Sequence, residues 1–198
     1  MSEKRTKAKE LNTISSVSAS ITLRQRSNFA VQHMLAAARF SRRVGQIERS
    51  GEPLGNFFNE IISFVSATIL SSVAALEANI NEYFAEPETN FPGQNRQVFH
   101  KTWELIEQKP ILDKYQWSLV LKGKAELNKG ELVFQDADNV IRLRNLLVHF
   151  KPEWHDEQIE HKKIESRLTG KFKPSPFIGT SGVFFPQKCM SYGVPVGL

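Results

Sequence analysis

The stretch "IISFVSATILSSVAALEANINEYF", residues 61–84, decides the fold. Apolar residues recur in it every seven positions from Ile62 to Tyr83, a spacing that predicts one helix face packed on other helices. Small Ser and Ala residues fill many of the positions between them and would let a partner helix approach closely. The stretch therefore predicts a long second helix, residues 56–85, in the core of a helical bundle.

Further helices are predicted on both sides of this stretch. They are residues 22–49, residues 98–107, a helix that begins at Pro110, a helix that begins near Asp136 or Asp138 and ends before Pro152, and residues 156–168. Either aspartate could cap the helix that it begins. Alternating apolar patterns are nearly absent outside the C-terminal part, so we predict an all-α, up-and-down bundle of about five helices with an irregular C-terminal tail.

Composition divides the 198 residues into three parts. Residues 1–21 are charged and then rich in Ser and Thr, which predicts a disordered or loosely attached N-terminal segment. Residues 22–170 hold the predicted helices and form one domain, as this chain length favours. Residues 171–198 are rich in Gly, Pro and aromatic residues, which predicts the irregular tail.

Several classes of site are disfavoured by the residues present. The single cysteine, Cys189, excludes an intrachain disulfide and a cysteine-based zinc cage. His155 and His161 lie among acidic residues, but the ligand spacing of a metal site is missing, so we expect no metal and no cofactor. Neither a GxSxG elbow nor a phosphate-binding Walker loop is present.

The cellular location can be predicted from whether the sequence contains a membrane-spanning segment or a secretory signal. The longest uncharged run, residues 61–76, is shorter than the roughly 18 apolar residues of a membrane-spanning helix. No secretory signal is visible in the charged first ten residues. We therefore expect a cytoplasmic protein without a membrane partner.

The basic residues are concentrated in the first predicted helix. The formal net charge is +5, and the segment from residue 24 to residue 49 carries six arginines against one acid. A nucleic acid is a typical partner for such a surface, and Arg39, Arg42 and Arg43 are the candidate RNA-binding residues. The alternative is a solvated helix face with no binding role.

The helix predicted before Pro152 carries the stretch "RLRNLLVHFKPEW", residues 142–154. Placed at about 100° per residue, its polar residues Arg142, Asn145 and His149 form a narrow strip. Arg144 does not belong to that strip and falls inside the apolar arc. On an ideal helix Arg144 and His149 point about 140° apart, so a straight helix does not bring them together easily.

Arg144 needs an explanation because an unpaired buried charge costs several kcal/mol. It must reach solvent, pair with a carboxylate, or face another molecule. Glu77 interrupts the apolar face of the second helix, and we hypothesise that it pairs with Arg144.

His149 is suited to proton transfer, since carbonyl groups at a helix C-terminus favour the imidazolium form. An arginine nearby would hold phosphate oxygens and stabilise developing charge. The spacing of Arg144 and His149 alone is weak evidence, because Arg26 with His33 and Arg142 with His149 are spaced similarly. Only Arg144 combines an apolar setting with a polar neighbour and a histidine at the helix end.

This stretch resembles the signature of the HEPN superfamily, in which an Arg, a polar residue and a His follow one another at this spacing. "SSVAALEANINEYF", residues 71–84, is similar to the small-residue helix with an embedded Glu of several HEPN families. The stretch "KPILDKYQWSL", residues 109–119, also resembles HEPN sequences. The resemblance covers roughly residues 25–170. One departure is that related chains continue into another helix past the point where this one ends at "VPVGL", so the tail would lack a terminal helix.

The resemblance implies an α-helical, metal-independent endoribonuclease that cleaves RNA by attack of a 2′-hydroxyl on the adjacent phosphate. The matching catalytic positions are Arg144, Asn145 and His149, with Glu77 in support. It also implies a homodimer with a composite active site, and a toxin or phage-defence role with an antitoxin protein as partner. The alternative is a catalytically inactive HEPN-like module that binds nucleotide, RNA or a protein, with Arg144 only pairing with Glu77 or bridging a dimer interface.

Overall fold

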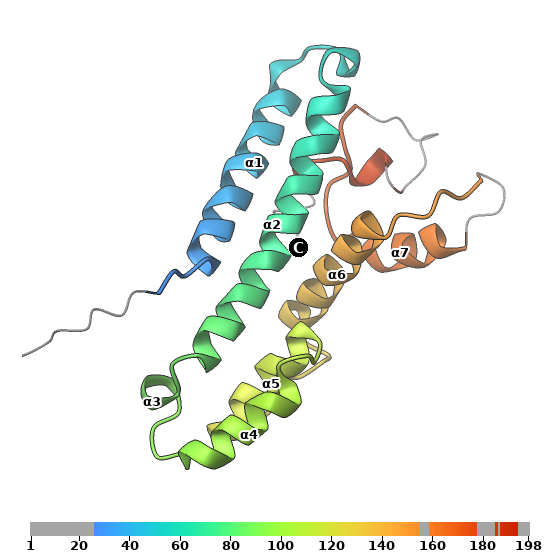
Figure 1. The fold of residues 1–198 in the computed structure, drawn as a ribbon. Coiled ribbons are helices and arrows are strands. Elements are labelled where there is room, and N and C mark those ends of the chain that lie inside the picture. The colour runs from blue at the N-terminus through green and yellow to red at the C-terminus, as the bar shows by residue number, and fades with distance from the viewer. Residues whose placement is uncertain (1–25, 155–158, 178–184, 186, 194–198) are drawn as a thin grey trace, which may run out of the picture.

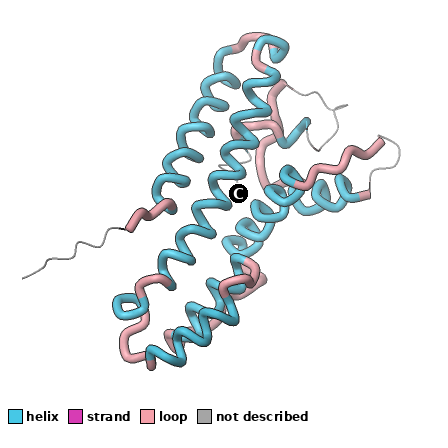
Figure 2. Tube along the Cα trace, viewed as in Figure 1, coloured by secondary structure: helices cyan, strands magenta, loops and turns pink. Residues whose placement is uncertain are grey.

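The fold is all-helical in a computed structural model that describes residues 26–154, 159–177, 185 and 187–193. Seven α-helices and no strand occur in these ranges (Figures 1 and 2). The predicted all-α class is confirmed, while the α-helices outnumber the predicted five or so. The α-helices are α1 Ala30–Ser50, α2 Phe58–Phe84, α3 Pro87–Asn90, α4 Arg96–Ile106, α5 Ile111–Leu121, α6 Leu132–Val148 and α7 Glu160–Leu168. Two 3₁₀ turns, Leu54–Asn56 and Gln187–Cys189, complete the regular structure.

The long helix α2 is the element on which the others are assembled (Figure 1). α1 runs back along α2, while α5 and α6 pack against other parts of its length. Gly51 ends α1 in the left-handed conformation, with φ of 74°, which residues with a Cβ rarely adopt. α2 itself spans Phe58–Phe84, so the predicted span of residues 56–85 is confirmed to within two residues.

One end of α2 packs in a cluster of aromatic side chains. Ile80 and Phe84 of α2 meet Phe91 and two residues of α4, Phe99 and Ile106. Asn95 fixes the start of α4, because its side chain accepts hydrogen bonds from the first backbone N–H groups of that helix. This cluster joins α2 to α4 and lies away from the predicted site.

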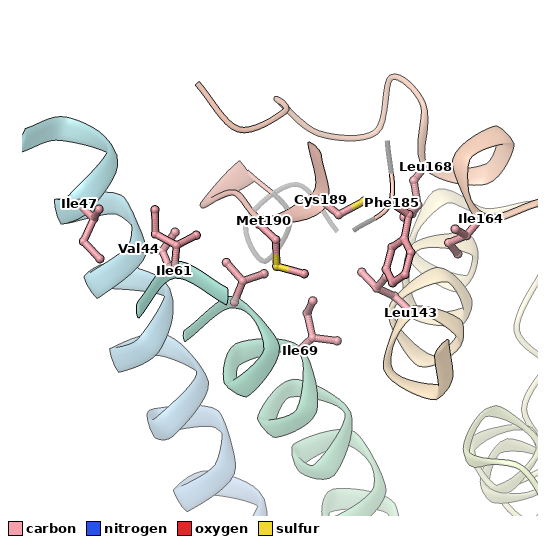
Figure 3. Close-up of a cluster of buried hydrophobic side chains, with 11 residues drawn as sticks. Val44, Ile47, Ile61, Ile69, Leu143, Ile164, Leu168, Phe185, Cys189 and Met190 are labelled. Atoms are coloured by element: carbon pink, nitrogen blue, oxygen red, sulfur yellow. The ribbon is translucent and has the colours of Figure 1, made fainter. Parts of the chain in front are cut away.

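The main core is built from α1, α2, α6, α7 and the C-terminal segment. Its buried residues are Val44, Ile47, Ile61, Val65, Ile69, Leu143, Ile164, Leu168, Phe185, Cys189 and Met190. Figure 3 shows Met190 and Cys189 between the side chains of α1 and α2 and those of α6 and α7. The segment predicted as an irregular tail thus contributes to the core, although it has no α-helix of more than one turn among its described residues.

Two helix starts differ from the sequence prediction. α1 begins at Ala30 and not near residue 22, because Glu82 of α2 accepts the backbone N–H groups of Phe29 and Ala30 at 2.5 and 2.9 Å. A carboxylate at a helix N-terminus is favourable. The part of the prediction before residue 26 lies outside the described residues.

The predicted aspartate cap of the helix that carries the motif is wrong. α6 begins at Leu132, which places Asp136 and Asp138 inside the helix. Both carboxylates bind cations instead: Asp136 accepts from Lys171 at 2.9 Å, and Asp138 accepts from Arg142 Nε at 2.7 Å. The predicted end before Pro152 is confirmed.

By length and composition α2 is a candidate membrane span, which the uncharged run alone did not indicate. Core helices of soluble proteins pass the same test. In this structure α2 is the central packing element, as described above.

We expect the Cys189 thiol to react slowly with iodoacetamide in the folded protein. Burial, helped by the nearby Glu165 carboxylate, raises the pKa of this thiol from 9.0 to about 12. Because only the thiolate is nucleophilic, the rise lowers the reactive fraction roughly a thousandfold near pH 8. Mass spectrometry of labelling in buffer and in urea measures the difference.

A matched pair of variants tests whether packing of the C-terminal segment gives this protection. Leu168→Ala removes a fully buried contact of the same core and should speed labelling, whereas Leu105→Ala on α4, at a position 74% exposed, should not. Equal labelling rates in buffer and in urea would contradict the packing described.

Candidate functional site

A basic cleft of about 660 Å³ lies between α6 and α7. Its lining residues are Arg142, Asn145, Leu146, His149, Lys151, His161, Lys163, Ile164, Ser166 and Arg167. Four of the lining side chains are Lys or Arg, and none of the described lining residues is acidic. The cleft therefore has the electrostatic character of a site for an anion.

The α6 wall of the cleft is the polar strip that the sequence predicts. Arg142, Asn145 and His149 all lie on it, at helical spacings of three and four that place them on one face. His149 is the C-cap residue of α6, and its backbone N–H donates to the carbonyl of Asn145 at 2.9 Å. The side chains of Asn145 and His149 are exposed to solvent and accessible to a ligand.

Asp138 holds the two arginines of the cleft. Its Oδ2 lies 2.7 Å from Arg142 Nε and 3.7 Å from Arg167 Nη1, so one carboxylate orients guanidinium groups from both helices. Both arginine side chains remain about half exposed. Asp138, Arg142 and Arg167 together retain a net positive charge, and the remaining N–H groups of the arginines can bind an anion.

The α7 wall contributes His161, which is only 5% exposed. Its Nδ1 lies 3.7 Å from Glu153 Oε2, and its buried Nε2 has no hydrogen-bond partner in the part of the chain that the structure describes. Leaving a buried polar group unpaired costs about 1–3 kcal/mol, so this nitrogen needs an explanation. From the sequence His161 is a residue of a solvated polar helix, and its burial overturns that interpretation.

Arg144 does not line the cleft. It lies one helical turn after Val140, on the α6 face that borders a separate apolar groove. Its Nε is buried and has no hydrogen-bond partner among the described residues. The structure therefore brings Asn145 and His149 together with Arg142, and not with Arg144. The divergence of Arg144 and His149 expected for an ideal helix is present.

The hypothesised pair of Glu77 and Arg144 is not formed. Glu77 lies 4.0 Å from the Nζ of Lys114, which is 3% exposed and donates to Asn81 Oδ1 at 3.0 Å. Glu77 thus helps to compensate a buried lysine on α5. The sequence prediction missed this lysine because it lies within an apolar helix whose partner is set only by tertiary packing.

The candidate RNA-binding arginines of α1 are exposed and lie away from the cleft. Arg43 is paired with Glu60 of α2, at 2.7 Å from Nε and 2.6 Å from Nη2, which offsets its charge. Arg39 and Arg42 are both exposed on the same helix. They are a second basic surface, separate from the cleft that contains His149.

The apolar groove, of about 560 Å³, lies among α1, α2, α5 and α6. Tyr115 lines it and donates its hydroxyl to the carbonyl of Leu76 at 3.0 Å. Burial raises the pKa of this tyrosine above its usual value of 10.0. Most residues that line the groove are apolar, so it offers few side chains for proton transfer or for binding an anion, unlike the basic cleft.

The sequence prediction missed Lys151, Lys163 and Arg167 as members of the site. Two of them belong to α7, which the sequence shows only as a polar helix. Among the described residues no three His, Cys, Asp or Glu side chains are grouped as metal ligands, and His155 lies outside those residues. The titratable groups that line the cleft in the described residues are those of Lys, Arg and His.

Comparisons of the chain with models of protein families, with curated proteins and with solved structures found no match.

We expect the cleft, and not α1, to provide most of the affinity for a single-stranded polyanion. Replacing both Arg142 and Arg167 by Gln should weaken binding of a labelled oligonucleotide and lower the salt slope of log affinity by about 0.7 for each lost phosphate contact. Fluorescence anisotropy across a salt series measures both quantities. The matched control replaces Arg39 and Arg42 by Gln, and a larger loss in that variant would contradict this assignment.

Proposed function

We propose that this protein is a metal-independent endoribonuclease whose α6–α7 cleft binds RNA. The observation that carries the proposal is that His149 and Asn145 share one cleft with Arg142 and Arg167. A group able to transfer a proton thus lies among cations that can bind a phosphate. The resemblance of the sequence to HEPN ribonucleases supports the same reaction.

The proposed reaction uses a nucleophile that the RNA supplies. The 2′-hydroxyl attacks the adjacent phosphorus, and the bond from phosphorus to the 5′-oxygen of the next nucleotide breaks. His149 transfers a proton, Arg142 and Arg167 stabilise the negative charge on the phosphate, and Asn145 orients either the histidine or the substrate. Lys151 and Lys163 add to the positive potential along the backbone of the RNA.

Arg144 has a place in this proposal only through a second copy of the chain. Within one chain Arg142 lies beside Asn145 and His149, and Arg144 lies outside their cleft. The homodimer implied by the HEPN resemblance would bring Arg144 of one chain to the cleft of the other. The unpartnered Nε of Arg144 supports such a role, because another molecule would satisfy it.

The biological setting of the proposal rests on the HEPN resemblance alone. In that setting the protein is a cytoplasmic toxin or phage-defence component, and an antitoxin protein restrains it.

Incubation of the purified protein with RNA in EDTA tests the proposed activity. We expect cleavage by the wild type and a loss of at least about a hundredfold in His149→Gln, as for removal of a general acid–base group. His100→Gln, at an exposed histidine that lies 3.6 Å from Glu104 on α4, is the matched control and should cleave normally. Circular dichroism checks that both variants are folded.

The arginine variants distinguish a cleft formed within one chain from a cleft that is completed by Arg144 of a second chain. Arg142→Gln should reduce cleavage in either case, while Arg144→Gln should reduce it only if a second chain completes the cleft. In that case a mixture of Arg144→Gln and His149→Gln chains should regain activity through heterodimers.

The second candidate is a catalytically inactive helical module that binds nucleotide, RNA or a protein partner. The position of Arg144 outside the cleft favours it, since the motif arginine and histidine do not act together in one chain. Oligonucleotide binding without cleavage by the folded wild type would support this candidate and contradict the ribonuclease.

A further inference from the structure

His161 is fixed in place at the cleft by two aromatic rings. The ring of Phe150 stacks on it with centroids 5.7 Å apart at 22°, and Phe185 meets it edge-on at 5.1 Å. Phe150 follows α6 directly, and Phe185 comes from the C-terminal segment. Two other parts of the chain therefore hold one imidazole that also lines the cleft.

The Nδ1 side of the imidazole faces an anchored carboxylate. Glu153 Oε2, 3.7 Å from Nδ1, also accepts the backbone N–H groups of Ile159 and His161 at the start of α7, each at 3.2 Å. A carboxylate at this position favours the tautomer that carries its proton on Nδ1. In that tautomer Nε2 has a free lone pair and acts as an acceptor.

Among the described residues the Nε2 of His161 has no hydrogen-bond partner. Buried polar atoms are nearly always paired, and His161 is one of the residues that line the cleft, so a ligand group that reaches this nitrogen would supply the missing bond. A carboxylate on Nδ1 with a free Nε2 is the arrangement by which a histidine accepts a proton from a hydroxyl.

The proposed reaction requires two proton transfers on opposite sides of the phosphorus. The attacking and leaving oxygens lie roughly in line, so one imidazole cannot contact both in the same step. His149 is the C-cap residue of α6 and His161 lies in the first turn of α7, and these two helices form the two walls of the cleft. The cleft thus has one histidine for each side.

We propose that His161, held by Glu153, is the general base of this cleft, and that His149 is the general acid. This inference rests on the proposed ribonuclease function. His161 Nε2 takes the proton of the 2′-hydroxyl as the 2′-oxygen bonds to phosphorus. The bond from phosphorus to the 5′-oxygen breaks, and that oxygen receives a proton from His149, which leaves a 2′,3′-cyclic phosphate and a 5′-hydroxyl.

A pair of substrates separates the two roles. A dinucleotide has a poor leaving group that needs a proton, while the p-nitrophenyl ester of a nucleoside 3′-phosphate has a leaving group that departs without one. Loss of the acid is therefore rescued by the second substrate, and loss of the base is not, because both substrates need removal of the 2′-proton.

The test compares His161→Phe and His149→Gln with the wild type on both substrates in EDTA. Phenylalanine retains the aromatic packing at position 161, and slow labelling of Cys189 reports that the core is intact. We expect His161→Phe to lose at least about a hundredfold in kcat on both substrates. His149→Gln should lose as much on the dinucleotide and regain most of its rate on the p-nitrophenyl ester.

Glu153→Gln is a second variant that keeps the histidine. It should lower kcat by roughly tenfold or more with little change in KM, because the carboxylate positions the ring and its tautomer and does not bind the substrate. His100→Gln should again match the wild type.

The possible failures are distinguishable. If the wild type cleaves both substrates and folded His161→Phe stays within about threefold of it, His161 is not the base while the proposed function stands. Rescue of His161→Phe by the p-nitrophenyl ester would also overturn its role as base. A wild type that cleaves neither substrate contradicts the proposed function and this inference together.

Discussion

The packing of α6 against α7 through one apolar contact region is the constraint on which the site depends. Leu143, fully buried on α6, shares a core with Ile164 and Leu168 of α7 and with Phe185 of the C-terminal segment. Burying each such side chain stabilises the fold by about 1.5–3 kcal/mol. Because Asn145 and His149 follow Leu143 on the same helix, this packing places them in one cleft with His161 and Arg167.

Local sequence signals were enough to predict most of the helices. The seven-residue spacing gave α2 to within two residues, and Pro152 marked the end of the motif helix. The starts of α1 and α6 were not predictable in this way. Glu82, distant in sequence, binds the N-terminus of α1, and Asp138 binds Arg142 instead of capping a helix.

Only the part of the site that lies on a single helix was predictable from the sequence. The polar strip of Arg142, Asn145 and His149 follows from helical geometry, and so does the position of Arg144 on another face. The burial of His161 follows from contacts with Phe185, 24 positions later in the chain, since Phe185 is brought to α7 by packing of the core. Such a contact leaves no periodic signal in the sequence, which shows α7 only as a polar helix.

The most direct measurement is nuclear magnetic resonance of the histidine rings during titration with a short 2′-O-methyl oligonucleotide, which can bind but lacks the attacking hydroxyl. We expect the ring signals of His149 and His161 to shift together and to saturate. Those of His33 on α1 and His100 on α4 should stay in place. Saturable shifts at His33 with His149 and His161 unmoved would place the ligand on α1 and contradict the account.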